Sequence, residues 1–395
     1  MQKINKVLIA GASIIMALLI VTGFTARYYV GANALVDADA SNLRVAGRSA
    51  LLMDHDTGTV VFEQNADERH PIASMVKIMT LNLVFDEMRN GNLTADCDVQ
   101  ISQHAASMGG SQAFMDAGSS YKVGELIKSI VVASANDACV ALAEHISGDA
   151  QLFVDKMNER AKALGMENTN FANCTGLPSP NGYSTARDVA KMTQEMIRHP
   201  EFFEYSTIWM FDFAHPSGRT TELANTNKLV RFYEGCDGGK TGFTNESKYC
   251  LSATAKRGNT RLISVVIGAE TSKIRNAENS KLFNYGFANY ETKRLVEQGA
   301  IVEGEFAVKN GKTKTVQVMP EKDFFHFAKR NQKSEFTFEN IVDSLKAPLE
   351  KGQIVGTMRI MNGGTEIGTI NLITTDAILK AGYLDILNDI ISQWN

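Results

Sequence analysis

Residues 71–81 read Pro71-Ile72-Ala73-Ser74-Met75-Val76-Lys77-Ile78-Met79-Thr80-Leu81. Most of these residues favour helices, and apolar side chains would occupy most faces of the helix they form. We therefore predict a buried helix that begins just after Pro71. Residues three apart share a helix face, which would bring the Lys77 amine against the Ser74 hydroxyl. The segment predicts a serine and a lysine held together at the start of a buried helix.

Such a pair suits nucleophilic catalysis. Burial and a neighbouring cation such as Lys240 would lower the pKa of the Lys77 amine, leaving a neutral base for the Ser74 proton. Free N–H groups at the helix start would favour an oxyanion. Taken alone, the pattern is more typical of a serine at a helix start beside a snorkelling lysine. A second S-x-x-K, Ser119 to Lys122, lies in a polar turn where nothing would bury the lysine.

A second motif, Ser134-Ala135-Asn136, lies between two apolar helical segments, residues 123–132 and 138–146. A loop there can place a hydroxyl and an amide in a cleft without breaking a helix, and the hydroxyl could relay a proton to a leaving amine. In isolation, an Asn/Ser turn or a helix cap reinforced by Asp137 is the more common structure.

A third motif, Lys240-Thr241-Gly242, lies in the glycine-rich residues 237–243. These residues predict a strand edge that a ligand or another backbone can approach closely, where lysine and threonine could hold a carboxylate. The alternative is a glycine-rich turn with a solvated lysine. A phosphate-binding G-x-x-x-x-G-K-[ST] loop does not fit, because Glu234 occupies the position of its first glycine.

The pattern around these motifs predicts strands at both ends of the segment and helices between them. This arrangement indicates a mixed sheet to which both ends contribute. Beyond about residue 295, short alternating apolar runs separated by turn signals indicate a small β-rich domain. The expected strands are residues 48–61 (a hairpin through Asp56-Thr57-Gly58), 248–255, 261–267, 301–308 and 315–319, and the further helices are residues 150–164 and 185–197.

Composition excludes several classes of function. The 395 residues are 44% hydrophobic and 21% charged, which is ordinary for a globular protein. Forty basic and forty-four acidic residues without a long basic run give no electrostatic footprint for nucleic acid. The five cysteines have no C-x-x-C spacing, so neither a zinc site nor a disulfide framework is indicated. We expect no metal and no cofactor.

The first 34 residues have a different character. Lys3 and Lys6 precede an uncharged apolar run, residues 7–24, which is followed by Ala32-Asn33-Ala34. This order is typical of an export signal. The run approaches the length of a membrane span, so cleavage after Ala34 and retention as an N-terminal anchor both fit, and we favour cleavage.

Taken together and in this order, the three motifs resemble those of the penicillin-recognising serine enzymes. The resemblance is closer to the low-molecular-weight D-alanyl-D-alanine carboxypeptidases and runs from about residue 44 to residue 290. Residues 347–360 also look like the C-terminal β domain of that family. The stretches that carry the closer resemblance are Leu164-Gly165-Met166-Glu167-Asn168-Thr169, Cys174-Thr175-Gly176-Leu177, Tyr183-Ser184-Thr185-Ala186-Arg187-Asp188 and Arg261-Leu262-Ile263-Ser264-Val265-Val266.

The resemblance implies an α/β (α+β) domain of the serine β-lactamase/transpeptidase type, with a mixed sheet and helices, followed by a small all-β domain. The expected organisation is a signal peptide or anchor over residues 1–34, a catalytic domain over 44–292, a β-rich domain over 296–380 and a C-terminal amphipathic helix over 381–395.

The resemblance also implies roles for individual residues. Ser74 would form the acyl-enzyme, Lys77 would be the general base and Ser134 the proton shuttle. The substrate-binding residues would be Asn136 for the amide, Lys240, Thr241 and Arg275 for the terminal carboxylate, and Phe243, whose backbone N–H would join that of Ser74 in an oxyanion hole. Some relatives carry histidine or threonine where this chain has Phe243, which should alter the shape of the pocket and leaves the pH profile open.

The implied function is serine-type removal of the terminal D-alanine from peptidoglycan stem peptides ending in D-Ala-D-Ala. β-Lactams would bind covalently, and the enzyme would act outside the cytoplasm, at the cell wall and associated with the membrane. A D,D-endopeptidase acting on cross-links is the alternative, because it performs the same chemistry. A β-lactamase fits less well, since Glu167 lacks the E-x-x-L-N frame of a deacylating base, and the presence of all three motifs argues against a non-catalytic wall-binding protein.

The C-terminal segment places apolar side chains on one helical face. This face could lie on a membrane surface, although Asp385 and Asp389 would be repelled by anionic lipid. Packing against the β-rich domain is the alternative that we favour. The residues of the face are Tyr383, Leu387, Ile390, Ile391 and Trp394.

Overall fold

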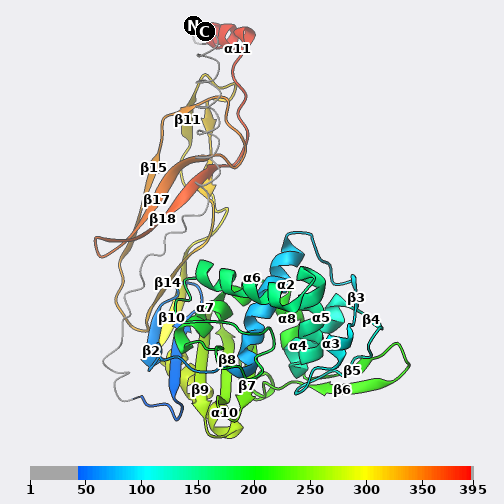
Figure 1. The fold of residues 1–395 in the computed structure, drawn as a ribbon. Helices are drawn as coiled ribbons and strands as arrows, with labels where there is room; N and C mark the ends of the chain where they lie inside the picture. Colours follow the sequence, from blue (N-terminus) through cyan, green and yellow to red (C-terminus); the bar gives the residue numbers. More distant parts are fainter. Residues whose placement is uncertain (1–42, 393–395) are drawn as a thin grey trace, which may run out of the picture. The chain divides into compact units, whose positions relative to one another are not determined.

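The computed structural model describes the backbone of residues 43–392 and the side chains of residues 43–387 (Figure 1). The predicted export signal and the predicted position of Trp394 lie outside the described residues. Within the described part of the chain, no helix combines the length and the apolar character that crossing a membrane requires.

A five-stranded sheet forms the centre of the part that carries the motifs, with strand order β2-β1-β9-β8-β7. As predicted, strands from both ends of this part build the sheet. Every pairing is antiparallel, so the prediction of a mixed sheet is wrong in that respect. Short turns suffice to join antiparallel strands, and such turns connect β7, β8 and β9. The strands are β1 (Ser49–Asp54), β2 (Val60–Gln64), β7 (Cys236–Thr244), β8 (Lys248–Arg257) and β9 (Thr260–Ala269).

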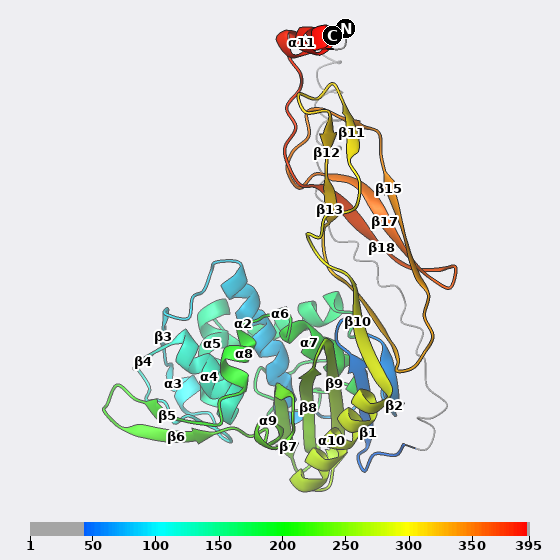
Figure 2. The same cartoon turned by 180° about the vertical axis from the view of Figure 1, so that it is seen from behind.

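Both faces of this sheet are covered, as strand β1 illustrates. Successive side chains of a strand point to opposite faces. Leu51 and Met53 belong to the core formed with the main helical layer, whereas Ala50 and Leu52 belong to the core that includes α10 (Ser272–Asn289). Figure 2 shows α10 beside β8 and β9. All six residues of β1 are buried, as expected for a strand between two layers.

The helical layer shares one hydrophobic core with the sheet. The four further helical segments predicted from the sequence are present to within three residues at each end. Shorter elements are α3 (Gln103–Ala106), α8 (Phe202–Ser206), α9 (Leu229–Phe232) and the hairpins β3/β4 (Asp98–Gln100, Ser120–Lys122) and β5/β6 (Met210–Ala214, Thr220–Ala224). The main helices are α2 (Lys77–Arg89), α4 (Val123–Ala133), α5 (Asn136–Ser147), α6 (Ala150–Ala163) and α7 (Ala186–Met196).

The C-terminal part is built of strands around its own apolar core, which confirms the predicted all-β character. The strand expected over residues 301–308 is wrong in its first half, because Gly304 has a φ of +106° and β11 begins only at Phe306. The strands are β10 (Tyr290–Val296) with β14 (Phe324–Lys329), β11 (Phe306–Lys309) with β12 (Thr315–Val316) and β16 (Leu345–Lys346), and β13 (Val318–Pro320), β15 (Phe336–Val342), β17 (Ile354–Asn362) and β18 (Thr365–Thr374).

The last described element is α11 (Tyr383–Ser392). Its described apolar side chains are exposed, with 80% of Tyr383 and 71% of Leu384 accessible. The favoured prediction that this segment packs against the β-rich domain is therefore wrong for Tyr383 and Leu384, which remain mostly exposed. The side chains of Ile390 and Ile391 lie outside the described residues.

Candidate active site

Ser74 lies in a tight turn that precedes a helix. Residues Ala73–Val76 form a 3₁₀ turn, and α2 follows directly at Lys77. Ala73 has a left-handed φ of +47°, which is a strained conformation for a residue with a side chain. Two glycines make room for this turn, because a Cβ on Gly176 would lie 2.0 Å from the Ala73 carbonyl oxygen and a Cβ on Gly242 2.6 Å from that of Ile72. The turn is thus held by close backbone contacts on two sides.

Lys77 connects this turn to two other segments. Its buried Nζ donates to Ser74 Oγ at 3.1 Å, to Asn136 Oδ1 at 2.6 Å and to the Thr175 carbonyl oxygen at 2.6 Å. A lysine ammonium can donate to all three oxygens, whereas the neutral amine, with two N–H donors and a lone pair, can donate to Asn136 and Thr175 and accept from the Ser74 hydroxyl. The arrangement brings the first and second sequence motifs into direct contact.

The surroundings of Lys77 favour a neutral amine. Burial lowers its pKa, because a charged amine loses hydration there. Burial also raises the pKa of Cys139 to about 11 and that of Cys174 to about 12, so both neighbouring thiols are uncharged near neutral pH. Of the neighbours that could retain the proton on Lys77, Asp137 is the one carboxylate, and it accepts hydrogen bonds from backbone N–H groups. Lys77 is therefore able to act as a base.

The second motif presents an unpartnered hydroxyl. Ser134 caps the C-terminus of α4 with a left-handed φ of +67° and is 4% exposed. Within the described residues its Oγ has no hydrogen-bond partner. A buried hydroxyl without a partner costs free energy, which is unusual unless a ligand or water supplies the partner. Asn136 uses Oδ1 for Lys77 and one amide hydrogen for the Gly109 carbonyl, which leaves a second amide hydrogen.

The third motif lies on β7, at the edge of the main sheet. Lys240 is buried, and its Nζ donates to the Thr241 carbonyl at 3.2 Å; the Thr241 hydroxyl donates to Thr226 Oγ1 at 2.8 Å. Burial lowers the pKa of Lys240 strongly, and the charges of Lys77 and Arg275 lower it further. No ion pair joins Lys240 to an acid in the described part of the chain. The carboxylate of a bound ligand could form the ion pair that Lys240 lacks.

Arg275 and Phe243 lie around the same motif. Arg275, on α10, is buried and donates to Asn276 Oδ1 at 2.9 and 3.0 Å. Burial lowers its pKa to about 10, so it remains charged at neutral pH. Arg275 acts on Lys240 through its charge alone, since no hydrogen bond joins Arg275 to the motif residues among the described residues. Phe243 is half-exposed, with its ring 4.3 Å from that of Tyr249 between centroids.

The role of Thr175 was not predicted from the sequence. Asn173 Oδ1 accepts hydrogen bonds from the Thr175 N–H, the Thr175 hydroxyl and the Gly176 N–H. This side-chain turn directs the Thr175 carbonyl at Lys77. The signal was the run Asn173-Cys174-Thr175-Gly176, which is typical of an Asx turn ended by glycine. Its partner could not be identified, since Lys77 is 98 residues away.

Two further expectations concern residues outside this cluster. Glu167, weighed as a deacylating base, is exposed at the surface. Lys122 of the second S-x-x-K is also exposed and pairs with Asp98 at 2.8 Å. Among residues 43–392, no group of three or more histidine, cysteine, aspartate or glutamate side chains is arranged to hold a metal ion.

Comparison with known proteins identifies the family. A family model described as D-alanyl-D-alanine carboxypeptidase matches residues 36–271, more than half of the chain. The chain belongs to the D-alanyl-D-alanine carboxypeptidase family. A second model, described as the C-terminal domain of penicillin-binding protein 5, matches residues 290–380 of this carboxypeptidase-family chain. The predicted family, catalytic fold class and all-β C-terminal domain are thereby confirmed.

Individual relatives agree with this assignment. The chain is 38% identical to the D-alanyl-D-alanine carboxypeptidase DacF of Bacillus subtilis, over 90% of this chain and 91% of DacF. Penicillin-binding protein 5 of Haemophilus influenzae has a similar structure, with a TM-score of 0.69, 34% identity and coverage of 86% of this chain and 99% of that one. The DD-transpeptidase of Streptomyces K15 gives a TM-score of 0.59 and 30% identity over 62% of this chain and 99% of its own.

Proposed function

We propose that this chain is a serine-type D-Ala-D-Ala carboxypeptidase that removes the terminal D-alanine from peptidoglycan stem peptides through an acyl-enzyme on Ser74. The observation that carries the proposal is the buried Lys77 amine, 3.1 Å from the Ser74 hydroxyl and hydrogen-bonded to Asn136. Family membership supports the same chemistry.

Acylation follows from this geometry. Neutral Lys77 accepts the Ser74 proton as Oγ attacks the carbonyl carbon of the penultimate D-alanine. The backbone N–H groups of Ser74 and Phe243 receive the negative charge on the carbonyl oxygen. As the C–N bond breaks, the proton passes through the Ser134 hydroxyl to the leaving amine, and free D-alanine departs. The unpartnered state of Ser134 Oγ suits a group that acts only when substrate is present.

Substrate binding uses the free edge of β7. A peptide added as a strand to this edge would place its terminal carboxylate at Lys240 and Thr241, with Arg275 adding positive charge. Asn136 would hold the amide of the bound peptide with its second amide hydrogen. Water then hydrolyses the ester and regenerates Ser74. A β-lactam would acylate Ser74 in the same way, but its cleaved amide nitrogen stays tethered to the acyl group.

The same acyl-enzyme could serve an endopeptidase that cuts D-alanine cross-links. That reaction differs only in the size of the leaving amine. One structural relative is named a DD-transpeptidase, which indicates that the fold also accommodates transfer to an amine. Comparing release from a monomeric and a cross-linked peptide separates the carboxypeptidase from the endopeptidase.

We also propose that the enzyme acts outside the cytoplasm, at the cell wall and on the membrane surface. The charged and apolar sequence of residues 1–34 supports export. The exposed Tyr383, Leu384, Ile386 and Leu387 of α11 support contact with a membrane surface. Co-sedimentation with lipid vesicles, with and without residues 381–395, tests this contact.

The decisive experiment measures D-alanine release from diacetyl-L-Lys-D-Ala-D-Ala by the purified chain, with Ser74→Ala as control. We expect release by the native chain and none by the variant. If the native chain releases no D-alanine but penicillin labels Ser74, the site favours cross-linked substrate. Absence of both release and labelling would refute the catalytic proposal.

A further inference from the structure

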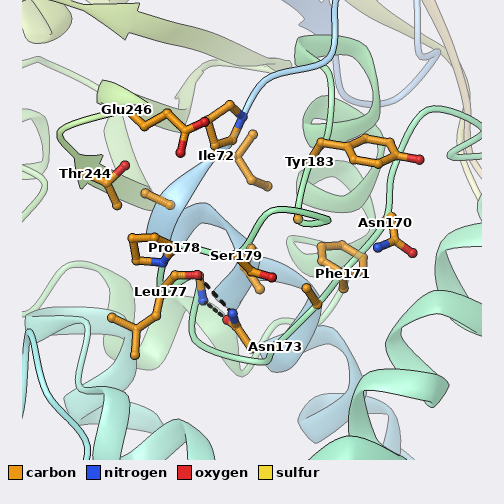
Figure 3. Close-up of a pocket in the computed structure, with 16 residues that line it drawn as sticks. Ile72, Asn170, Phe171, Asn173, Leu177, Pro178, Ser179, Tyr183, Thr244 and Glu246 are labelled. Carbon is orange, nitrogen blue, oxygen red and sulfur yellow. Dashed lines mark hydrogen bonds between the residues drawn. The ribbon is translucent and has the colours of Figure 1, made fainter.

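A hollow lies beside the nucleophile turn and does not take part in the chemistry described above. The hollow is shallow, because the about 410 Å³ of space not filled by atoms includes the open solvent in front of it and only a small part is enclosed. Figure 3 shows Thr244 and Glu246 on one side of it, Tyr183 and Asn170 on the other, and Ile72 between them. Its wall includes Ala73, the residue next to Ser74. The hollow therefore adjoins the site of acylation.

Glu246 is the one charged residue among those that line the hollow. In the described part of the chain its carboxylate takes part in no ion pair, and Arg48 donates to the Glu246 backbone carbonyl at 2.8 Å. Arg69 lies 4.7 Å from the ring centroid of Tyr183, which lines the hollow, and donates to Asn168. The wall thus presents one exposed carboxylate that forms no ion pair with the described residues.

The polar groups elsewhere in the wall are largely committed to the protein itself. Asn173 binds the backbone of its own loop through both ends of its amide. Asn170 donates to the Asn181 carbonyl, and Thr244 exchanges a hydrogen bond with Ser247. Glu246 is therefore the group best able to distinguish one ligand from another by charge.

The position of the hollow along β7 indicates which part of a substrate reaches it. A peptide whose carboxylate lies at Lys240 and Thr241, and whose scissile bond lies beside Gly242 and Ser74, runs antiparallel to β7. Its preceding residues then extend toward Thr244 and Glu246. Strands rise about 3.4 Å per residue, so Thr244 lies about 7 Å beyond Gly242, the reach of the residue before D-Ala-D-Ala.

We propose that this hollow receives the side chain of the residue that precedes D-Ala-D-Ala, and that Glu246 selects a side chain bearing an ammonium group. This inference rests on the proposed function, because it assigns a specificity subsite to the same reaction. An ammonium would supply the opposite charge that Glu246 lacks, at the rim of the hollow, where such a pair contributes modestly. A neutral side chain of equal length would lose that attraction.

The test compares two substrates with the full chain: Nα-acetyl-L-Lys-D-Ala-D-Ala, whose side-chain amine is free, and the Nα,Nε-diacetyl form. For the native chain we expect kcat/KM to be about two- to fivefold higher for the free amine, as an exposed ion pair allows. Glu246→Gln should bring this ratio to about one, and Glu246→Lys should invert it. Glu234→Gln, which removes an exposed acid outside the hollow, should keep the native ratio. Thermal melts check that all variants are folded.

The outcomes separate the two proposals. Equal kcat/KM for both peptides in the native chain, or an undiminished preference in Glu246→Gln, would overturn the subsite while D-alanine release upholds the carboxypeptidase. Release from neither peptide would overturn the proposed function and the subsite with it. A preference that also shrinks in 1 M salt would support the electrostatic origin, since salt screens exposed charges.

Discussion

Lys77 is a buried amine surrounded by oxygen acceptors, with Ser74 Oγ, Asn136 Oδ1 and the Thr175 carbonyl all within 3.1 Å. Such a site holds the amine in a fixed position next to the nucleophile. Its burial disfavours the charge that a surface lysine would carry. At the residue scale, the chemistry of the site depends on this one environment.

Replacing Lys77 with methionine keeps the volume of the side chain and removes the base. We expect acylation of Ser74 to fall about 100- to 10,000-fold, the usual contribution of a general base. The free energy of unfolding should fall by about 1–3 kcal/mol, because the buried Asn136 and Thr175 oxygens that accept from Lys77 lose their donor. Stopped-flow acylation by a β-lactam and a thermal melt measure the two effects.

The matched control is Lys122→Met, which removes the exposed lysine of the second S-x-x-K and its ion pair with Asp98. Its acylation rate should equal that of the native chain. In the native chain, acylation should increase as pH rises through the lowered pKa of Lys77, since only the neutral amine accepts a proton. An equal loss of rate in both variants would contradict the assigned role of Lys77.

At the scale of elements, the loop of residues 173–177 acts as a support for the nucleophile turn. Thr80, on α2, donates to the Cys174 carbonyl at 2.7 Å, which ties the loop to the helix that follows Ser74. Gly176 has a left-handed φ of +81° and touches the backbone of Ala73. The loop therefore packs directly against the turn and is tied to the helix that follows it.

Gly176→Ala should displace the nucleophile turn, because its Cβ would lie 2.0 Å from the Ala73 carbonyl oxygen. Gly165→Ala provides a matched control, since Gly165 also has a left-handed φ, of +66°, but its Cβ would meet no atom within 4 Å. Backbone strain should lower the free energy of unfolding of both variants by about 1–2 kcal/mol. The clash with Ala73 should add a further loss in Gly176→Ala. Only Gly176→Ala should also lose at least about tenfold in kcat/KM, a change of about 1.4 kcal/mol. Equal activities would show that the turn does not depend on the loop.

At the scale of the whole described chain, the main sheet depends on pairing between strands that are far apart in the sequence. Strand β1 pairs with β9, more than 200 residues later, and places the two cores on opposite faces. At the end of β1, the buried Asp54 accepts hydrogen bonds from Thr57 and from Thr292 on β10. One carboxyl group thus connects the turn between β1 and β2 to the first C-terminal strand, β10.

The ionisation of Asp54 should couple stability to pH. Burial raises its pKa from 3.8 to about 7, so the folded chain retains a proton that the unfolded chain releases. Its contribution to stability is full below about pH 4 and is lost as pH rises toward 7. Measured by chemical unfolding, the free energy of unfolding should therefore fall less between pH 5 and pH 8 for Asp54→Asn than for the native chain. Asp98→Asn, an exposed control, should keep the native decline, and an identical decline in all three proteins would refute this coupling.

The sequence by itself determined the local features of this protein. The spacing of Ser74 and Lys77, the break between two apolar helices at Ser134 and the glycines around Lys240 each depend on neighbours within a few residues. The same holds for the predicted helices and for the β-rich C-terminal part, whose periodicity is local. The order of the three motifs sufficed for the family, which the comparisons confirm.

The tertiary structure alone decided what depends on distant pairing. Strand β1 pairs with its neighbour β2 and also with β9, more than 200 residues later, and the antiparallel direction of the second pairing is set by the tertiary structure. The Thr175 carbonyl reaches Lys77 across 98 residues, and Glu246 comes to share a hollow with residues near position 72 through the packing of β7 against the nucleophile turn. Side-chain periodicity specifies which face of an element is buried, but it carries no information about which distant element covers that face.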